Sequence, residues 1–132
     1  TFLPVKSSVV EKHDMHSEFF SLSSDTALRL QNAKNEGRRI IAVGTTSARV
    51  LEACTDEKGS LSAHSGETDI FIFPGYRWKF IDGLITNFHL PKSTLLLLVS
   101  AFAGKDFVFS AYEKAMEMRY RFYSFGDAML IL

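Results

Sequence analysis

The chain has 132 residues, of which 46% are hydrophobic, and its fifteen basic residues balance fifteen acidic ones. This length and apolar content suit a single domain, and a formal net charge of zero excludes a strong overall attraction for nucleic acid, so local basic patches would have to bind any polyanion. The single cysteine, Cys54, excludes an internal disulfide and a multi-cysteine zinc site, and we expect a reducing compartment, the cytoplasm.

The apolar segments and the first residues add two expectations. Residues 95–103 form an apolar stretch far shorter than the ~20 residues that a membrane helix needs, and the N-terminus lacks the layout of a signal peptide. We therefore expect no membrane contact. The chain starts at Thr1 and continues at once with apolar residues, without a methionine or a polar tail, so we expect it to be a piece of a longer protein.

The first half of the chain predicts alternating strands and helices. Residues 13–22 alternate in character, which indicates a strand. Residues 26–36 are rich in helix formers, with capping residues before them and a glycine after them. Residues 40–43 predict a short buried strand, and the turn at residues 44–47 leads into a second helix that reaches residue 53.

The second half begins with a polar segment, residues 55–66, that predicts a surface loop. Apolar patterns and turn residues then predict a strand at 69–73 and an extended segment at 80–85. An apolar helix at 95–103, capped by Ser93 or Thr94, follows. An amphipathic helix capped by Asp106 and a strand at 128–132 complete the prediction. The alternation favours an α/β fold with helices layered on a mainly parallel sheet. Because ligands bind beyond the carboxyl ends of such strands, we expect residues 44–46, residues 87–89 and Glu18 to meet in one crevice.

The loop at residues 86–95 carries the strongest functional signal. Asn87 and His89 project to the same side if the chain is extended. A histidine exchanges protons near neutral pH, and an amide binds a purine edge or a carboxylate. Lys92, Ser93 and the start of the next helix favour a bound carboxylate or phosphate, although the glycines of a P-loop are absent. The alternative is that Asn87 and His89 only satisfy buried loop carbonyls.

Two further clusters suggest chemistry, and each has a structural alternative. His16 and Glu18 share one face of a strand and suit acid–base catalysis, or else they belong to a solvated strand edge. Thr45, Thr46 and Arg49 suit ligand binding, or else they are a helix cap and a surface arginine. No metal site is expected, because the two histidines of the first predicted strand point to opposite faces.

Cations alternate with aromatic residues at residues 76–80 and again at residues 119–123. This combination binds phosphates and stacks on unpaired bases, but a half-exposed strand gives the same pattern. The strand alternative is favoured for the first run. Gly126-Asp127 makes the second run a loop and leaves both alternatives open there.

Six motifs together resemble one enzyme family. They are Thr1-Phe2-Leu3-Pro4-Val5, His13-Asp14-Met15-His16-Ser17-Glu18, Gly44-Thr45-Thr46-Ser47-Ala48-Arg49, Phe71-Ile72-Phe73-Pro74-Gly75-Tyr76, Asp82 through Thr94, and Tyr120 through Leu130. In this order they resemble the C-terminal part of the S-adenosylmethionine:tRNA ribosyltransferase-isomerase family of the queuosine pathway. Tyr123 and Phe125 depart from the aromatic residues that are frequent in the family, without loss of an obviously required polar group.

The resemblance implies an enzyme that transfers the ribosyl moiety of S-adenosylmethionine to the aminomethyl-deazaguanine wobble base of tRNA and isomerises it, giving epoxyqueuosine, adenine and methionine. Residues 1–132 would be the C-terminal portion of its α/β catalytic domain. The smaller β-barrel domain that the family inserts in its N-terminal half would be absent. The implied partners are the tRNA, S-adenosylmethionine as co-substrate, and the N-terminal half of the same protein, with no other cofactor. A fragment of this kind would carry only part of the site.

The chemistry of this reaction suggests roles for residues in the motifs. We expect His16 or His89 to transfer protons, Glu18 to favour the sulfonium, Thr45, Thr46 and Asn87 to bind polar edges of the substrate, Lys92 and Ser93 to hold a carboxylate or phosphate, and Arg49 and Arg121 to bind tRNA phosphates. The competing hypothesis is a non-catalytic RNA- or nucleotide-binding α/β module.

Overall fold

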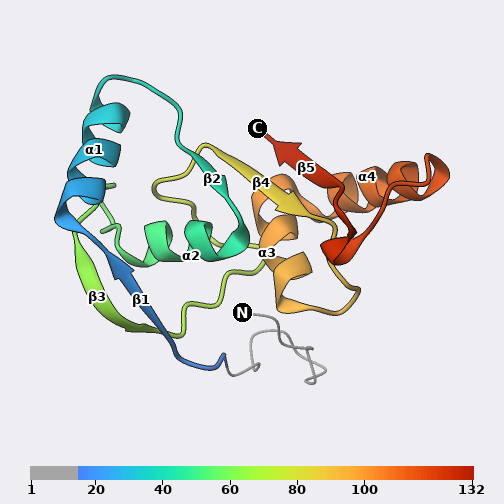
Figure 1. Cartoon of the computed structure of the whole chain (residues 1–132), viewed down its shortest axis with the longest axis horizontal. Coiled ribbons are helices and arrows are strands. Elements are labelled where there is room, and N and C mark those ends of the chain that lie inside the picture. The colour runs from blue at the N-terminus through green and yellow to red at the C-terminus, as the bar shows by residue number, and fades with distance from the viewer. Residues whose placement is uncertain (1–14) are drawn as a thin grey trace.

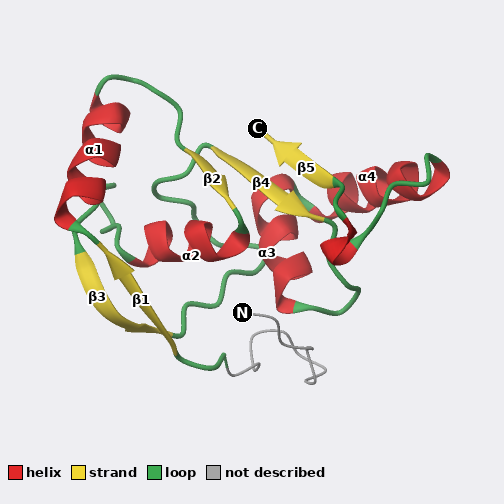
Figure 2. Ribbon diagram, in the orientation of Figure 1, coloured by secondary structure: helices red, strands yellow, loops and turns green. Residues whose placement is uncertain are grey.

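The computed structural model describes residues 15–132. The first of the six motifs and residues 13 and 14 of the expected first strand lie outside this range. In chain order the elements are β1 (Glu18–Leu22), α1 (Ser24–Asn35), β2 (Ile41–Val43), α2 (Thr45–Ala53), β3 (His64–Thr68), β4 (Gly83–Asn87), α3 (Thr94–Ala103), α4 (Lys105–Glu117), a 3₁₀ turn (Tyr123–Phe125) and β5 (Ala128–Ile131). Strands and helices alternate from β1 to β3, and then the two strands β3 and β4 and the two helices α3 and α4 follow one another in the described chain (Figures 1 and 2).

The strands form two sheets. One has the order β2-β4-β5, with β2 parallel to β4 and β5 antiparallel to β4. The other is the antiparallel pair β1-β3. Figure 1 shows α1 and the β1-β3 ribbon at one end of the molecule and α4 at the other. The α/β class is therefore confirmed, although the strand pairing is mixed and not mainly parallel in the described part of the chain.

Two helices that meet at a glycine lead to β5. Gly104 has φ +86°, a left-handed conformation that favours glycine, and it ends α3 and starts α4. The two helices meet there at a bend of 112°. Residues 118–127, which include the 3₁₀ turn, then connect α4 to β5. We expected Asp106 to cap α4, but Gly104 takes that position and Asp106 lies in the first turn.

The strand predicted at residues 69–73 is wrong, and a strand forms instead at β3, which begins within the segment predicted as a surface loop and ends two residues after it. β3 is polar because it is an edge strand whose residues are all half-buried or exposed. Its partner β1 follows the predicted alternation, with Phe20 and Leu22 buried and Phe19 exposed. Ile72 is buried although no strand forms around it, since it packs in the core as part of a loop.

The hydrophobic core lies between the three-stranded sheet and its helices. Its largest fully buried apolar side chains are Ile72, Phe80, Leu84, Leu98 and Val99. The apolar helix α3 contributes two of them, as expected for a helix that is apolar almost all round. In the described range no single helix is both long and apolar enough to cross a bilayer, and α3 and α4 satisfy that criterion only when their bent pair is counted together.

Candidate functional site

The carboxyl ends of β2 and β4 lie side by side. The parallel register pairs Val43 with Ile85, and the Gly44 N–H donates to the Ile85 carbonyl at 2.8 Å. The start of α2 is thereby fixed next to the end of β4, where Asn87 lies. Two of the segments that we expected at one sheet edge are neighbours, as the strand order of an α/β sheet allows.

His89 follows β4 and is held from two sides. Its backbone N–H donates to the Tyr112 hydroxyl at 2.7 Å, and its ring Nε2 lies 2.8 Å from Thr86 Oγ1. Burial lowers the pKa of His89 to about 4 because the charged ring would lose its solvation. The imidazole is therefore neutral at neutral pH, and if the Thr86 hydroxyl donates to Nε2, the ring proton sits on Nδ1.

A hollow of about 380 Å³, here called the β4 hollow, opens beside this histidine. It is lined by Asn87, Phe88, His89, Leu90, Leu95, Tyr123 and Ser124. Tyr123 has φ +63°, which a tyrosine adopts only under strain, and its N–H donates to the Phe88 carbonyl at 3.1 Å. Motif reasoning did not assign Tyr123 or Ser124 to a site. The sequence signals for Tyr123 were the run of cations and aromatics at residues 119–123 and its place in the last of the six motifs.

Ser93 and Lys92 lie at the start of α3. Ser93 is buried and caps the helix as predicted, since its Oγ accepts from the Leu96 N–H at 3.2 Å and donates to the Leu90 carbonyl at 2.7 Å. These two bonds occupy the hydroxyl. Lys92 is exposed and has φ +54°. A role for either residue in holding an anion remains a prediction.

A second hollow, of about 130 Å³ and here called the α2 hollow, lies between α2 and the β1-β3 ribbon. It is lined by Glu18, Phe19, Phe20, Thr46, Arg49, Val50 and Thr68. Arg49 is 4% exposed, and its Nη1 donates to the Glu18 carboxylate at 2.5 Å. Its Nε donates to the Ile70 carbonyl at 3.2 Å. This burial fits poorly with the expected contact between Arg49 and tRNA phosphates.

Among the residues that the structure describes, the expected site residues that line a hollow are divided between two separate hollows. Asn87 and His89 line the β4 hollow, whereas Glu18, Thr46 and Arg49 line the α2 hollow. Thr45 is buried in the first turn of α2.

Two of the expected site residues, His16 and Arg121, line neither hollow and are exposed. Arg121 binds Asp127 through Nε and Nη2, and the same carboxylate accepts from the Arg121 N–H. Hydrogen bonds from Arg121 hold the pKa of Asp127 below its usual range.

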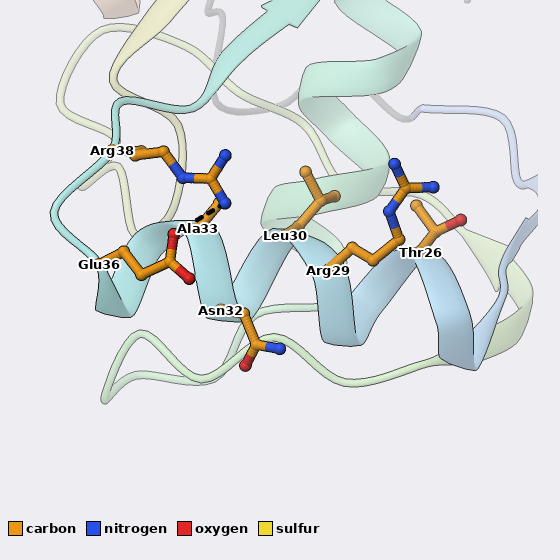
Figure 3. A pocket seen from close by; sticks show the side chains of 7 residues that line it. All are labelled: Thr26, Arg29, Leu30, Asn32, Ala33, Glu36 and Arg38. Atoms are coloured by element: carbon orange, nitrogen blue, oxygen red, sulfur yellow. Dashed lines mark ion pairs between the residues drawn. The ribbon is translucent and has the colours of Figure 1, made fainter.

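A third hollow runs along α1 and contains none of the expected site residues (Figure 3). Its lining residues are Thr26, Arg29, Leu30, Asn32, Ala33, Glu36 and Arg38. The Arg38 side chain turns toward Glu36 and pairs with it at 2.9 Å, and Arg29 lies 3.9 Å from Asp25. Because none of its lining residues is buried and none is an expected site residue, we do not consider this hollow a functional site.

Glu52, on α2, is a buried acidic residue that sequence reasoning missed. It is 0% exposed, and its carboxylate accepts from the backbone N–H groups of Lys79, Phe80 and Ile81 at 2.8 to 3.2 Å. Tyr76 adds a hydroxyl donor at 3.2 Å. Burial, followed by the Glu52 charge, raises the pKa of Tyr76. Glu52 thus fixes the segment that leads into β4, and with it the position of Asn87 and His89.

The chain is similar to known proteins along its whole length. Residues 1–131 match a family described as "Queuosine biosynthesis protein". The S-adenosylmethionine:tRNA ribosyltransferase-isomerases of Halothermothrix orenii and Carboxydothermus hydrogenoformans are 62% and 58% identical to it over 132 residues. Each alignment covers all of this chain and only 39% of the relative, so the chain spans about two fifths of the relatives' length.

A solved structure is also similar. The crystal structure of S-adenosylmethionine tRNA ribosyltransferase from Thermotoga maritima superimposes with a TM-score of 0.79 at 52% sequence identity. The superposition covers 86% of this chain and 40% of that one. The fold described above is therefore that of the matching part of this structure.

Proposed function

Because the chain belongs to the family of queuosine biosynthesis proteins, we propose that it is part of an enzyme that transfers the ribosyl moiety of S-adenosylmethionine to tRNA and isomerises it. The acceptor is the aminomethyl-deazaguanine wobble base, and adenine and methionine leave. The observation that carries this proposal is the 62% identity, along the entire chain, to a relative named for this reaction. It favours an enzyme over a non-catalytic RNA- or nucleotide-binding module. No cofactor besides the co-substrate is proposed, and we place the enzyme in the cytoplasm with its tRNA.

The β4 hollow supplies groups that suit the departure of adenine. The reaction needs a hydrogen-bond donor for the leaving base, and a neutral imidazole retains one N–H for that purpose. With a pKa of about 4, His89 is a weak base, so donation suits it better than removal of a carbon-bound proton. Asn87 offers an amide for the polar edge of the same base, and Tyr123 offers an aromatic face.

Exposed cations near this hollow suit the tRNA backbone. Lys92 follows His89 by three residues, and Arg121 precedes Tyr123 by two. Both side chains are exposed, which a phosphate contact requires. We propose that they bind tRNA phosphates while the wobble base approaches the β4 hollow. The buried Ser93 would then support this binding by capping the start of α3, and it would not contact a phosphate itself.

The proposal is tested in a complete enzyme, defined as the Halothermothrix orenii relative in which this chain replaces the matching part. Adenine release from S-adenosylmethionine is measured with tRNA that carries the precursor base. We expect the complete enzyme to release adenine. His89→Ala should slow adenine release by about 10²-fold or more, which is the usual contribution of a positioned proton donor. His64→Ala is the matched control, since His64 is exposed and lines neither hollow.

The outcomes separate the activity from the role of His89. A complete enzyme that releases no adenine with this tRNA would refute the proposed activity. Normal turnover of the His89→Ala variant would refute the role of His89 but leave the activity standing. The thermal midpoints of both variants are measured in parallel, so that a loss of folding is not taken for a loss of catalysis.

A further inference from the structure

Arg49 is a buried cation with one donor group unused. Its Nη1 and Nε have acceptors in Glu18 and Ile70, but its Nη2 is buried and has no hydrogen-bond partner among the described residues. An unpaired buried donor is costly, more so on a charged group, and such groups in folded proteins call for an explanation. An oxygen acceptor supplied by a ligand in the α2 hollow, which Arg49 lines, provides one.

The start of α2 points to the same ligand chemistry. α2 begins at Gly44 without a side-chain cap, although Ser23 and Ser93 cap α1 and α3. Thr46, in its first turn, lines the same hollow as Arg49 and is exposed. Uncapped N–H groups at a helix start and the helix dipole both favour an anionic oxygen there. The buried guanidinium and the helix start thus favour one carboxylate.

The size of the hollow narrows the ligand further. Glu18 already accepts from Arg49 Nη1, so the acceptor for Arg49 Nη2 has to come from a ligand in the hollow. A volume of about 130 Å³ suits a small end group that carries a carboxylate and not a nucleoside.

We propose that the α2 hollow binds the amino-acid end of the substrate, with the α-carboxylate on Arg49 Nη2. This inference rests on the proposed function, because S-adenosylmethionine and its product methionine both carry that end. It reassigns Arg49 from the tRNA to the co-substrate. It also gives Thr46 a role in lining the binding site and Glu18 a role in positioning Arg49.

The test varies the ligand and the arginine together. Binding of S-adenosylmethionine and of its decarboxylated analogue is measured by calorimetry on the complete enzyme and on its Arg49→Met variant. We expect loss of the carboxylate to weaken binding by tenfold or more in the unmodified enzyme, and by less than twofold in Arg49→Met, which lacks the partner. Arg29→Met, at an exposed arginine of α1, is the control and keeps the full difference.

Other outcomes overturn the proposal. If removal of the carboxylate weakens binding equally in the unmodified complete enzyme and in Arg49→Met, the carboxylate binds elsewhere. If Arg49→Met binds tRNA less tightly but still loses affinity when the ligand carboxylate is removed, Arg49 contacts tRNA phosphates and not the carboxylate. If Arg49→Met does not fold, L-methionine and its methyl ester are compared on the unmodified enzyme, and equal binding refutes the proposal. Adenine release is assayed separately, so an active enzyme without a carboxylate effect refutes this inference alone.

Discussion

Removal of the Glu52 carboxylate should destabilise the chain more than any surface change. Glu52→Ala leaves three backbone N–H groups without their acceptor, two of them buried and that of Lys79 partly buried. Each unsatisfied buried donor costs roughly 1–3 kcal/mol, and water that enters the vacated space recovers part of this. We therefore expect a loss of roughly 3–6 kcal/mol, a large fraction of the ~5–15 kcal/mol that stabilises a typical domain.

Glu52→Gln gives a graded comparison. The glutamine retains one oxygen acceptor and the shape of the side chain, but its NH₂ group faces a backbone N–H and repels it. We expect a loss of about 2–3 kcal/mol, between the unmodified chain and Glu52→Ala. This variant also keeps the experiment informative if Glu52→Ala does not fold.

Urea unfolding of the 132-residue chain measures both losses. With a dependence of roughly 1–3 kcal/mol per molar urea, a loss of 3 kcal/mol lowers the midpoint by about 1 M or more. The control is Glu57→Gln, whose side chain is 88% exposed and lies 3.9 Å from Lys79 Nζ, and which should change stability by less than about 0.5 kcal/mol. A loss under about 1 kcal/mol in Glu52→Ala would refute the reasoning, since the three N–H groups would then have other acceptors.

Three further changes have definite expectations. Asp82→Asn breaks the 2.7 Å ion pair with Lys34 at a partly exposed site, and urea unfolding should show a loss of about 1 kcal/mol, with no loss arguing against the pair. Gly83→Ala would place a Cβ 3.1 Å from a backbone oxygen of β5 and should cost about 1–3 kcal/mol, whereas Gly66→Ala meets only a side chain and should cost less; equal costs would contradict this. Because the pKa of His89 is lowered in the folded chain, the unfolded chain binds a proton below pH 6.5 that the folded chain does not bind. The free energy of unfolding should therefore fall between pH 6.5 and about 4 by up to about 1.4 kcal/mol per pH unit. In His89→Gln this dependence on pH should be weaker.

Local signals were sufficient where the structure is decided by neighbouring residues. The Ser93 cap, the apolar run after it and Gly104 predicted α3 almost to the residue. The alternation along residues 13–22, which puts Phe20 and Leu22 on one side, predicted β1. Asn87 and His89 were predicted together from their spacing, and they line one hollow.

Contacts between distant segments decided what the sequence could not show. β3 has no apolar periodicity, and it is a strand because it pairs with β1 from Glu18↔Thr68 to Leu22↔His64. The ion pair of Arg49 with Glu18 joins residues 31 positions apart, so neither partner could be identified from its own motif. Glu52 looks like one more polar residue of an amphipathic helix until the backbone of residues 79–81 is placed against it.

The two hollows differ in chemistry in the way that the proposed binding of one substrate at both would require. The β4 hollow combines a neutral imidazole, an amide and an aromatic face, which suit a nucleobase, whereas the α2 hollow combines a buried arginine and a helix start, which suit a carboxylate. The hydrogen bond from Gly44 to Ile85 ties the start of α2 to β4, and Gly44 adopts φ +91° to make that turn. Because this backbone bond joins the two elements, the spacing between the two hollows is set by the parallel β2-β4 pair.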